Sequence, residues 1–300
     1  LLPNIADHRD TLADWMSRAL GQRVTLEAVS GAWQQTRPRF SLSGVRLYDQ
    51  QNRPALYLEH LEATFGWRSL LVLQPRFSRL ELNGPALTVR RARDGHYYVG
   101  GIPINPANPG SGFSDWLFKQ DKVQVKRATL AWRDEVRDAP ALILRDLDFT
   151  LENRFNRHWV QVHATPPAAL SLPITLKAEL KGRSVSDLRT WSGVIRGSVA
   201  GSSLAQFAQW IDLPYPVARG WGAANVRLQI DKGVLKGVSV GVNVRDISTL
   251  LATGLPPLEL QDLRGSMAWT RSGLKQAIDV QVLTASLPGN KKVPAFTAGY

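Results

Sequence analysis

The sequence predicts a mostly β protein in which a long, curved antiparallel sheet is accompanied by a few short helices. Three observations lead to this prediction. Apolar and polar residues alternate over most of the 300 residues, as in strands that bury one face. A bulged form of this alternation recurs along the chain. A clear helical period appears near the amino terminus and otherwise only in short segments.

The first 21 residues predict an amphipathic helix. Asn4 is a residue type that caps helix starts, and Gly21 can end the helix in the left-handed conformation. We therefore expect a helix over residues 4–20 that packs on the sheet. Its apolar positions follow the i, i+3, i+4 spacing of one helix face and are Leu12, Trp15, Met16, Ala19 and Leu20.

An alternation interrupted by one three-residue step recurs in the strand segments. Such a step is what a β-bulge needs to keep the same face inward while the strand bends. The irregular spacing of the copies indicates a sheet that coils repeatedly in one direction, not a solenoid of fixed period. Ordinary half-buried strands produce a similar pattern, and this simpler interpretation stays open. The copies are residues 40–47, 56–63, 142–149 and 258–265, with a weaker one at 123–130.

Turn residues divide the chain. Residues 102–112 contain three prolines and two glycines and predict a loop. This loop separates a first β module, residues 22–105, from continuing modules over residues 106–300. Ser203 and Gln206 form a capping box that predicts a short helix near residues 203–212, and Ser114 can cap a helical turn from Trp116 to Lys119. The tripeptide from Asp231 to Gly233 predicts a hairpin between two valine-rich strands.

The residues that enzymes need are not grouped in this sequence. There is no cysteine, which excludes disulfides, cysteine zinc sites and iron–sulfur clusters and suits an oxidising compartment. His158 and His163 are five residues apart, so they lie on opposite faces of a strand and are expected at the surface. The carboxylates at 134–135, 146 and 148 are expected to be solvated or salt-bridged. We expect no catalytic residue, no metal site and no cofactor.

The net charge of +12 raises the question of nucleic-acid binding. The basic residues are scattered, however, with no run longer than two. Scattered charges are typical of the solvated face of a strand, and a binder of single strands would also show exposed aromatic residues along a basic stripe. Among the ten tryptophans, Trp15, Trp116 and Trp210 fall on helix patterns and Trp132 and Trp269 at strand ends, so packing is their expected role rather than stacking on a carbohydrate. We therefore expect no nucleic-acid partner.

Five elements follow one another in residues 1–100. They are the helix from Trp15 to Gly21 followed by Val24-Thr25-Leu26; Pro38-Arg39-Phe40-Ser41-Leu42 continuing to Val45 and Leu47; Ser69-Leu70-Leu71; the strand pair from Leu80 to Val89; and the segment from Asp94 to Val99. Their order resembles the start of an AsmA-like protein, most closely the YhdP branch. That family usually has tryptophan or a similar aromatic residue near Tyr97, and this chain departs mildly from that pattern.

This resemblance implies a function. Such proteins are anchored in the inner membrane of Gram-negative bacteria by one helix, extend through the periplasm, and carry phospholipids toward the outer membrane in an apolar groove of a curved sheet. The segment Leu1-Leu2-Pro3 then fits the exit from a membrane helix that this chain lacks. The expected partners are phospholipid acyl chains, the inner membrane and envelope proteins. The expected groove-lining residues are Leu56, Leu58, Leu142, Leu144, Val226, Leu228, Ile230, Val240 and Val242.

The alternative function is structural. An envelope-assembly or scaffold protein would have the same strands around a closed core and would transport no lipid. For any one of the nine positions, a place in a closed core remains the competing interpretation.

Overall fold

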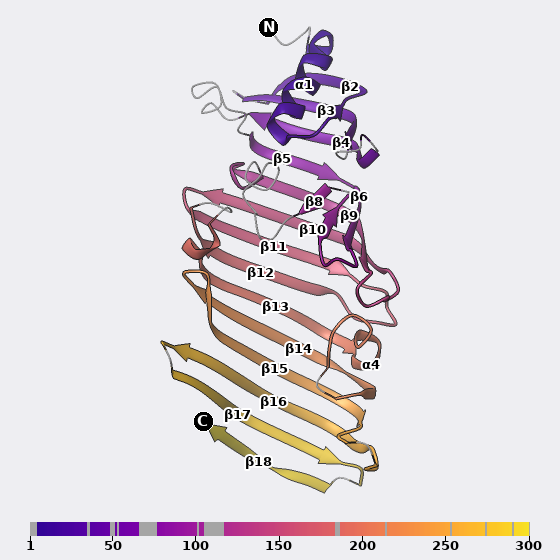
Figure 1. The fold of residues 1–300 in the computed structure, drawn as a ribbon, viewed down its shortest axis with the longest axis vertical. Helices are drawn as coiled ribbons and strands as arrows, with labels where there is room; N and C mark the ends of the chain where they lie inside the picture. Colours follow the sequence, from indigo (N-terminus) through magenta and orange to yellow (C-terminus); the bar gives the residue numbers. More distant parts are fainter. Residues whose placement is uncertain are drawn as a thin grey trace.

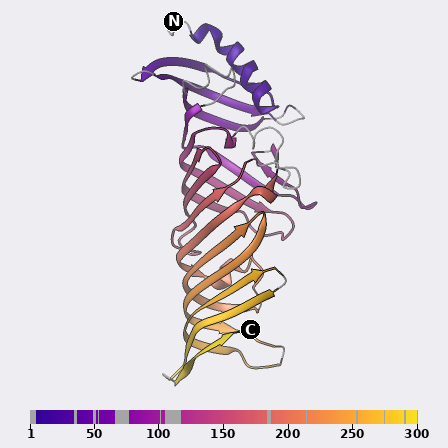
Figure 2. The ribbon, with the colours of Figure 1, turned by 90° about the vertical axis from the view of Figure 1, so that its left-hand side faces the viewer.

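The computed structural model is dominated by one long, open sheet of 18 strands, seen face-on in Figure 1. Figure 2 shows the same sheet from the side, where the strands curl and the sheet is bent. The predicted mostly β class with few helices is therefore confirmed. The structure describes residues 5–34, 37–48, 52, 54–65, 77–100, 102–104, 117–183, 187–213, 215–252, 254–273, 275–289 and 291–299.

Most of the strands follow one another along the sheet from the amino-terminal to the carboxy-terminal end (Figure 1). The first eight are β1 Val24–Thr25, β2 Ala28–Gln34, β3 Arg37–Tyr48, β4 Pro54–Phe65, β5 Phe77–Asn83, β6 Ala86–Arg91, β7 Tyr97–Val99 and β8 Ile102–Ile104. The next five are β9 Lys122–Asp134, β10 Leu142–Arg154, β11 Arg157–Thr165, β12 Ile174–Lys181 and β13 Ser192–Ser203. The last five are β14 Val217–Asp231, β15 Val234–Thr249, β16 Leu258–Ser272, β17 Lys275–Leu287 and β18 Lys291–Gly299.

Strand pairing is antiparallel except around β9. From β9 to β18 each strand pairs with the next one in sequence. The first half of β9 pairs in parallel with β5, and its second half pairs in parallel with β6. Strand β6 also begins a small branch through β7 to β8. The sheet is therefore mixed at one point and antiparallel elsewhere.

The predicted amino-terminal helix is present. It opens with a 3-10 turn, η1 (Ile5–His8), and continues as α1 (Arg9–Leu20). Gly21 ends it in the left-handed conformation, with φ of 66°, and donates its N–H to the Ser17 carbonyl. The Ser17 hydroxyl accepts a hydrogen bond from the Val24 N–H at 2.8 Å, which joins the helix to β1. The proposed cap Asn4 lies outside the described residues.

The three-residue steps of the 40–47, 123–130 and 142–149 copies each contain a residue of positive φ, whereas the step of the 56–63 copy lies opposite Gly44 of the paired strand. Backbone φ is positive at Gly44, Arg127 and Asp146, with values of 61°, 52° and 46°. The pairing of β10 with both neighbours shifts register beside Asp146. Asp246, with φ of 52°, lies in β15 opposite the step of the 258–265 copy in β16. Each bend changes the parity of the alternation, so the residues on both sides of it face the same way.

Of the other turn predictions, the hairpin turn and the short helix are both present, but the helix is shorter than predicted. Lys232 and Gly233 both have positive φ and form the two-residue turn between β14 and β15, as such hairpins require. The short helix is α4 (Leu204–Phe207), whose start is capped by the Ser203 hydroxyl. It is shorter than the predicted 203–212. A second short 3-10 helix is η2 (Leu188–Thr190).

The prediction of a loop over residues 102–112 is wrong for its first three residues, which form β8 and pair with β7. Pro103 has no N–H to donate, and a short strand paired on one side in the described structure accommodates it. Residues 105–112, Ser114 and Trp116 lie outside the described residues, so most of this loop and the start of the predicted turn are untested.

The main closed core lies under α1. The helix rests on one face of β2, β3 and β4 in both views (Figures 1 and 2). The partly buried Leu12, Trp15 and Met16 pack on this core, and the rings of Trp15 and Phe77 meet edge to face at 6.4 Å. Its buried members are Ala13, Val24, Leu26, Val29, Leu42, Val45, Leu47, Leu58, Leu61, Ala63, Phe77, Leu80, Val123 and Leu151.

Candidate functional site

Two rows of mainly apolar residues cross the sheet on the same face. Directly paired residues of neighbouring strands share a face, so the strand register defines each row. Row one consists of Leu151, Val160, Ala178, Ile195, Leu228, Val238, Trp269 and Ile278. Row two consists of Phe149, Val162, Leu176, Gly197, Val226, Val240, Met267 and Val280.

The opposite face of the same strands is polar. The residues between the two rows point the other way because side chains alternate along a strand. Arg196 on this face pairs with Glu179 at 3.2 Å. One row of this face is Gln161, Lys177, Arg196, Arg227, Ser239, Ala268 and Asp279. The sheet therefore has one apolar and one polar face, and water solvates the polar one.

The apolar rows change from covered to open along the sheet. Leu151 in β10 is only 1% exposed because it belongs to the closed core. Leu176 in β12 is 37% exposed, Met267 in β16 is 47% and Ile278 in β17 is 44%. We call residues 5–165 the covered part and strands β12 to β18 the open part. In the open part both rows keep the pattern of a buried face while their larger side chains are partly exposed.

A family comparison now identifies the chain. The profile of the family described as YhdP protein matches residues 1–298. The chain belongs to the YhdP family. No curated protein and no solved structure matched it. Within the part of the chain that the structure describes, no helix has the length and apolar character needed to cross a membrane.

Five of the nine predicted groove residues lie together in the open part of this YhdP-family chain. Val226 and Val240 are directly paired in row two, and Val242 is paired with Ala224 beside them. Leu228 belongs to row one, and Ile230 follows it on the same face of β14. All five are half-buried. They form one continuous apolar surface on β14 and β15.

The other four predicted residues lie in the covered part. Leu58 is buried in the main core, and Leu56 packs against it. Leu144 packs against a second buried cluster made of Ala128, Leu147 and Ala164. Leu142 is half-buried and pairs with Trp132. The structure therefore does not bring these four together with the five residues of the open part.

Sequence reasoning missed several residues of the open rows, among them Leu176, Ile195, Met267, Trp269 and Ile278. Their strands alternate in the same way as β14, so the signal was present. These residues belong neither to the bulged pattern nor to the valine-rich hairpin, the two signals on which the predicted groove residues rest.

His158 was expected at the surface, and that expectation is wrong. It is 5% exposed and stacks on Trp191 at 4.9 Å, with Phe118 edge-on at 5.4 Å. Its Nδ1 lies 2.6 Å from Asn153 Oδ1 and its Nε2 lies 3.3 Å from the Gly182 carbonyl. Burial lowers the pKa of His158, and the hydrogen bond to Gly182 opposes that shift.

The two histidines do lie on opposite faces. His158 pairs with Leu180 on the apolar side, whereas His163 pairs with Thr175 and is exposed. The ring of Trp191 lies directly over Gly182, where a side-chain Cβ would come within 2.6 Å of it. This aromatic cluster lies at one end of strands β10 to β12, where its rings pack on one another and His158 lies within hydrogen-bond distance of Asn153 and the Gly182 carbonyl.

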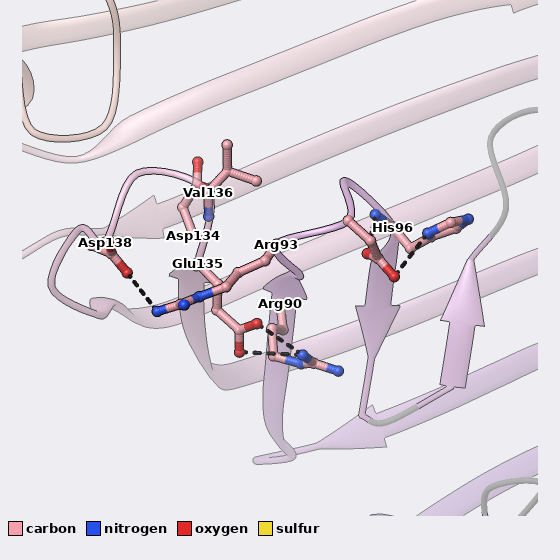
Figure 3. A network of polar contacts seen from close by, with 8 residues as sticks. Arg90, Arg93, His96, Asp134, Glu135, Val136 and Asp138 are labelled. Carbon is pink, nitrogen blue, oxygen red and sulfur yellow. Dashed lines mark hydrogen bonds and ion pairs between the residues drawn. The ribbon is translucent and has the colours of Figure 1, made fainter.

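The carboxylates at the turn between β9 and β10 are salt-bridged, as expected. Glu135 accepts two hydrogen bonds from Arg90, at 3.1 and 3.2 Å, and Arg93 pairs with Asp138 at 3.4 Å (Figure 3). Asp134 is 4% exposed and lies 3.5 Å from Arg91. These groups brace a turn. Among the described residues no three His, Asp or Glu side chains group to hold a metal ion.

Proposed function

We propose that this chain carries phospholipids, with their acyl chains lying on the open apolar rows. The observation that supports the proposal most strongly is the loss of cover along the rows, from Leu151 at 1% exposed to Met267 at 47%. A soluble protein rarely leaves a long apolar surface exposed unless something binds there. Membership of the YhdP family, which is a transport-type family, supports the same proposal.

The energetics suit a carrier. Each buried methylene gains about 0.8 kcal/mol, so an acyl chain of about 16 carbons gains roughly 10 kcal/mol when it leaves water for an apolar surface. That gain holds a lipid in the protein during transfer. A surface that covers only one side of the chain recovers less, which keeps the lipid mobile along the rows.

The place of action follows the family. We propose that the chain works in the periplasm of a Gram-negative bacterium, tethered to the inner membrane by a helix outside residues 1–300, and moves lipid toward the outer membrane. The family is associated with that envelope. Acyl chains, the inner membrane and envelope proteins are the proposed partners, with no nucleic acid. We propose a carrier without catalytic activity.

The alternative is a scaffold with a closed core. The covered part, in which α1 closes a core over β2, β3 and β4 (Figure 1), is what such a scaffold would show throughout. The open part from β12 onward favours the carrier.

Mass spectrometry of organic extracts from the purified chain tests the proposal. The unchanged protein is expected to release phospholipid, whereas Val240→Arg on row two is expected to release much less while remaining folded. Ser239→Arg is the matched control, because Ser239 precedes Val240 in β15 and faces the polar side. Absence of phospholipid from the unchanged protein, or equal loss in both variants, would contradict the proposal.

A further inference from the structure

A cavity of about 270 Å³ lies between α1 and the sheet, away from the open rows. The helix contributes Leu12, Trp15 and Met16 to its lining, and the sheet contributes Phe40, Ala63 and Phe77. All six are apolar. Protein interiors contain few voids larger than a water molecule, and apolar hollows with a few polar groups at the edge are the usual form of a ligand site.

Leu42 of β3 and three polar residues complete the lining: His8 at the end of η1, and Thr11 and Arg18 of α1. All three are exposed, so they form the rim of the cavity while the apolar residues form its wall. The cavity thus has an apolar interior with a basic rim on the helix side. We propose that it holds one acyl chain of a phospholipid, with the lipid phosphate against Arg18 and His8. This inference rests on the function proposed above.

The charge at the rim favours an anionic headgroup. Arg18 donates from Nε to the Asp14 carbonyl at 3.4 Å, and among the described residues no carboxylate lies within ion-pair distance of it. Asp10 of the same helix pairs with Arg9, and neither of these two lines the cavity. A guanidinium that is not neutralised binds a phosphodiester through two parallel hydrogen bonds, which a single ammonium cannot provide.

The cavity is continuous in register with the open rows but separated from them by closed core. Phe40 pairs with Ala63, Ala63 with Leu80, and Leu80 with Val123. Val123 in turn pairs with Leu151 of row one. Leu80, Val123 and Leu151 are buried. The cavity is therefore a separate holding site at the covered end of the same apolar face, which makes it testable apart from the open rows.

Site-specific photo-crosslinking tests this inference. The purified chain carries p-benzoylphenylalanine in place of Thr11, Asp14 or Val240, and is irradiated with vesicles of phosphatidylglycerol before intact-mass analysis. Thr11 and Asp14 are both exposed residues of α1, so neither substitution disturbs the core. Thr11 lines the cavity, whereas Asp14 does not. A lipid adduct is expected at Thr11 and at Val240 but not at Asp14.

The headgroup contact has its own test. Arg18→Gln is expected to lower the Thr11 adduct about tenfold, because a charge-assisted hydrogen bond to the phosphate is lost. Vesicles doped with diacylglycerol, which has no phosphate, are expected to give no adduct with diacylglycerol at Thr11. Equal adducts from both lipids, together with no effect of Arg18→Gln, would overturn the assignment of Arg18.

The remaining outcomes separate the two proposals. An adduct at Val240 with none at Thr11 would overturn the cavity site and leave the open rows as the lipid surface. Equal adducts at Thr11 and Asp14 would also overturn it, since the helix would then contact lipid without selecting a face. Adducts at none of the three positions would remove the proposed function itself.

Discussion

The covered and open parts of the sheet have the same alternating strand pattern, but only in the covered part is the apolar face buried in a closed core. In the covered part, α1 and the strand packing bury the apolar face of the sheet, and Leu42, Leu80 and Leu151 are at most 5% exposed. In the open part the rows continue in register, yet Met267 and Ile278 remain more than 40% exposed. Alternation therefore specifies which face is apolar, and a separate element decides whether that face becomes a core or a binding surface.

The largest difference is expected from a charge placed on each part. Leu151→Arg buries a charge without a partner and should destabilise the protein by about 3–5 kcal/mol. Val240→Arg should cost less than about 1 kcal/mol, because arginine can lay its stem on the surface and keep its head in water. Urea unfolding measures both values. Equal destabilisation by the two variants would mean that row two is closed core.

Removing a tryptophan from each part sharpens the same comparison. Trp15→Ala removes the ring that packs against Phe77 and should cost about 3 kcal/mol. Trp269→Ala in row one should cost about 1 kcal/mol, because its ring has a neighbour on each adjacent strand but no covering element. Thermal melts monitored by circular dichroism give both values. A melting curve unchanged by Trp15→Ala would contradict the role of α1 as a cover.

His158 lies where the covered and open parts meet, and we expect it to make the stability of the protein depend on pH. Burial lowers the pKa of His158 below the unperturbed value of 6.5, so the unfolded state binds its proton more readily than the folded state. The contribution of neutral His158 to the stability of the folded protein is complete above pH 6.5, and it is lost as the pH falls through the lowered pKa of His158 in the folded state.

Urea midpoints measured on both sides of the unperturbed histidine pKa, from about pH 4 to about pH 8, test this expectation. His158→Gln should flatten the decline of stability below pH 6.5. The exposed His163, on the same strand, supplies the control, since His163→Gln should retain the decline. A decline that persists unchanged in His158→Gln would show that another group causes it.

The smallest effects are expected at the bends. Asp146 in the covered part and Asp246 in the open part both have positive φ, a conformation that costs an L-residue about 1 kcal/mol and glycine almost nothing. Asp146→Gly and Asp246→Gly should each stabilise the protein by about 0.5 kcal/mol, after allowance for the greater freedom of glycine in the unfolded chain. Asp246→Val should destabilise it. Stabilisation by valine would show that the bend is not required.

Much of the local structure was predictable because it depends on neighbouring residues. Gly21 ends α1 and Lys232-Gly233 makes the hairpin turn, since each needs a backbone conformation that its sequence favours. The burial of His158 could also have been predicted from the sequence. It shares the parity of Val160 and Val162, which are apolar and face inward, and that parity outweighs the usual preference of histidine for the surface.

The remaining features depend on contacts that are distant in sequence. Nothing in the alternation of residues 54–65 shows that the main core under α1 would take in Leu58, whereas Val240 would stay open. The parallel pairing of β9 with β5 and β6 is equally invisible, because strand order is not encoded in the period of a strand. The cavity could not be predicted either, because it depends on where α1 lies on the sheet.

A photo-crosslinking scan along β15 tests the central claim most directly. The crosslinker is placed in turn at each residue from Val238 to Asn243, and adducts with phospholipid vesicles are measured by mass spectrometry. We predict adducts at 238, 240 and 242, which face the apolar side, and none at 239, 241 and 243, which face the polar side. Adducts without this alternation, or no adduct at any of the six positions, would contradict the claim that the open rows carry lipid.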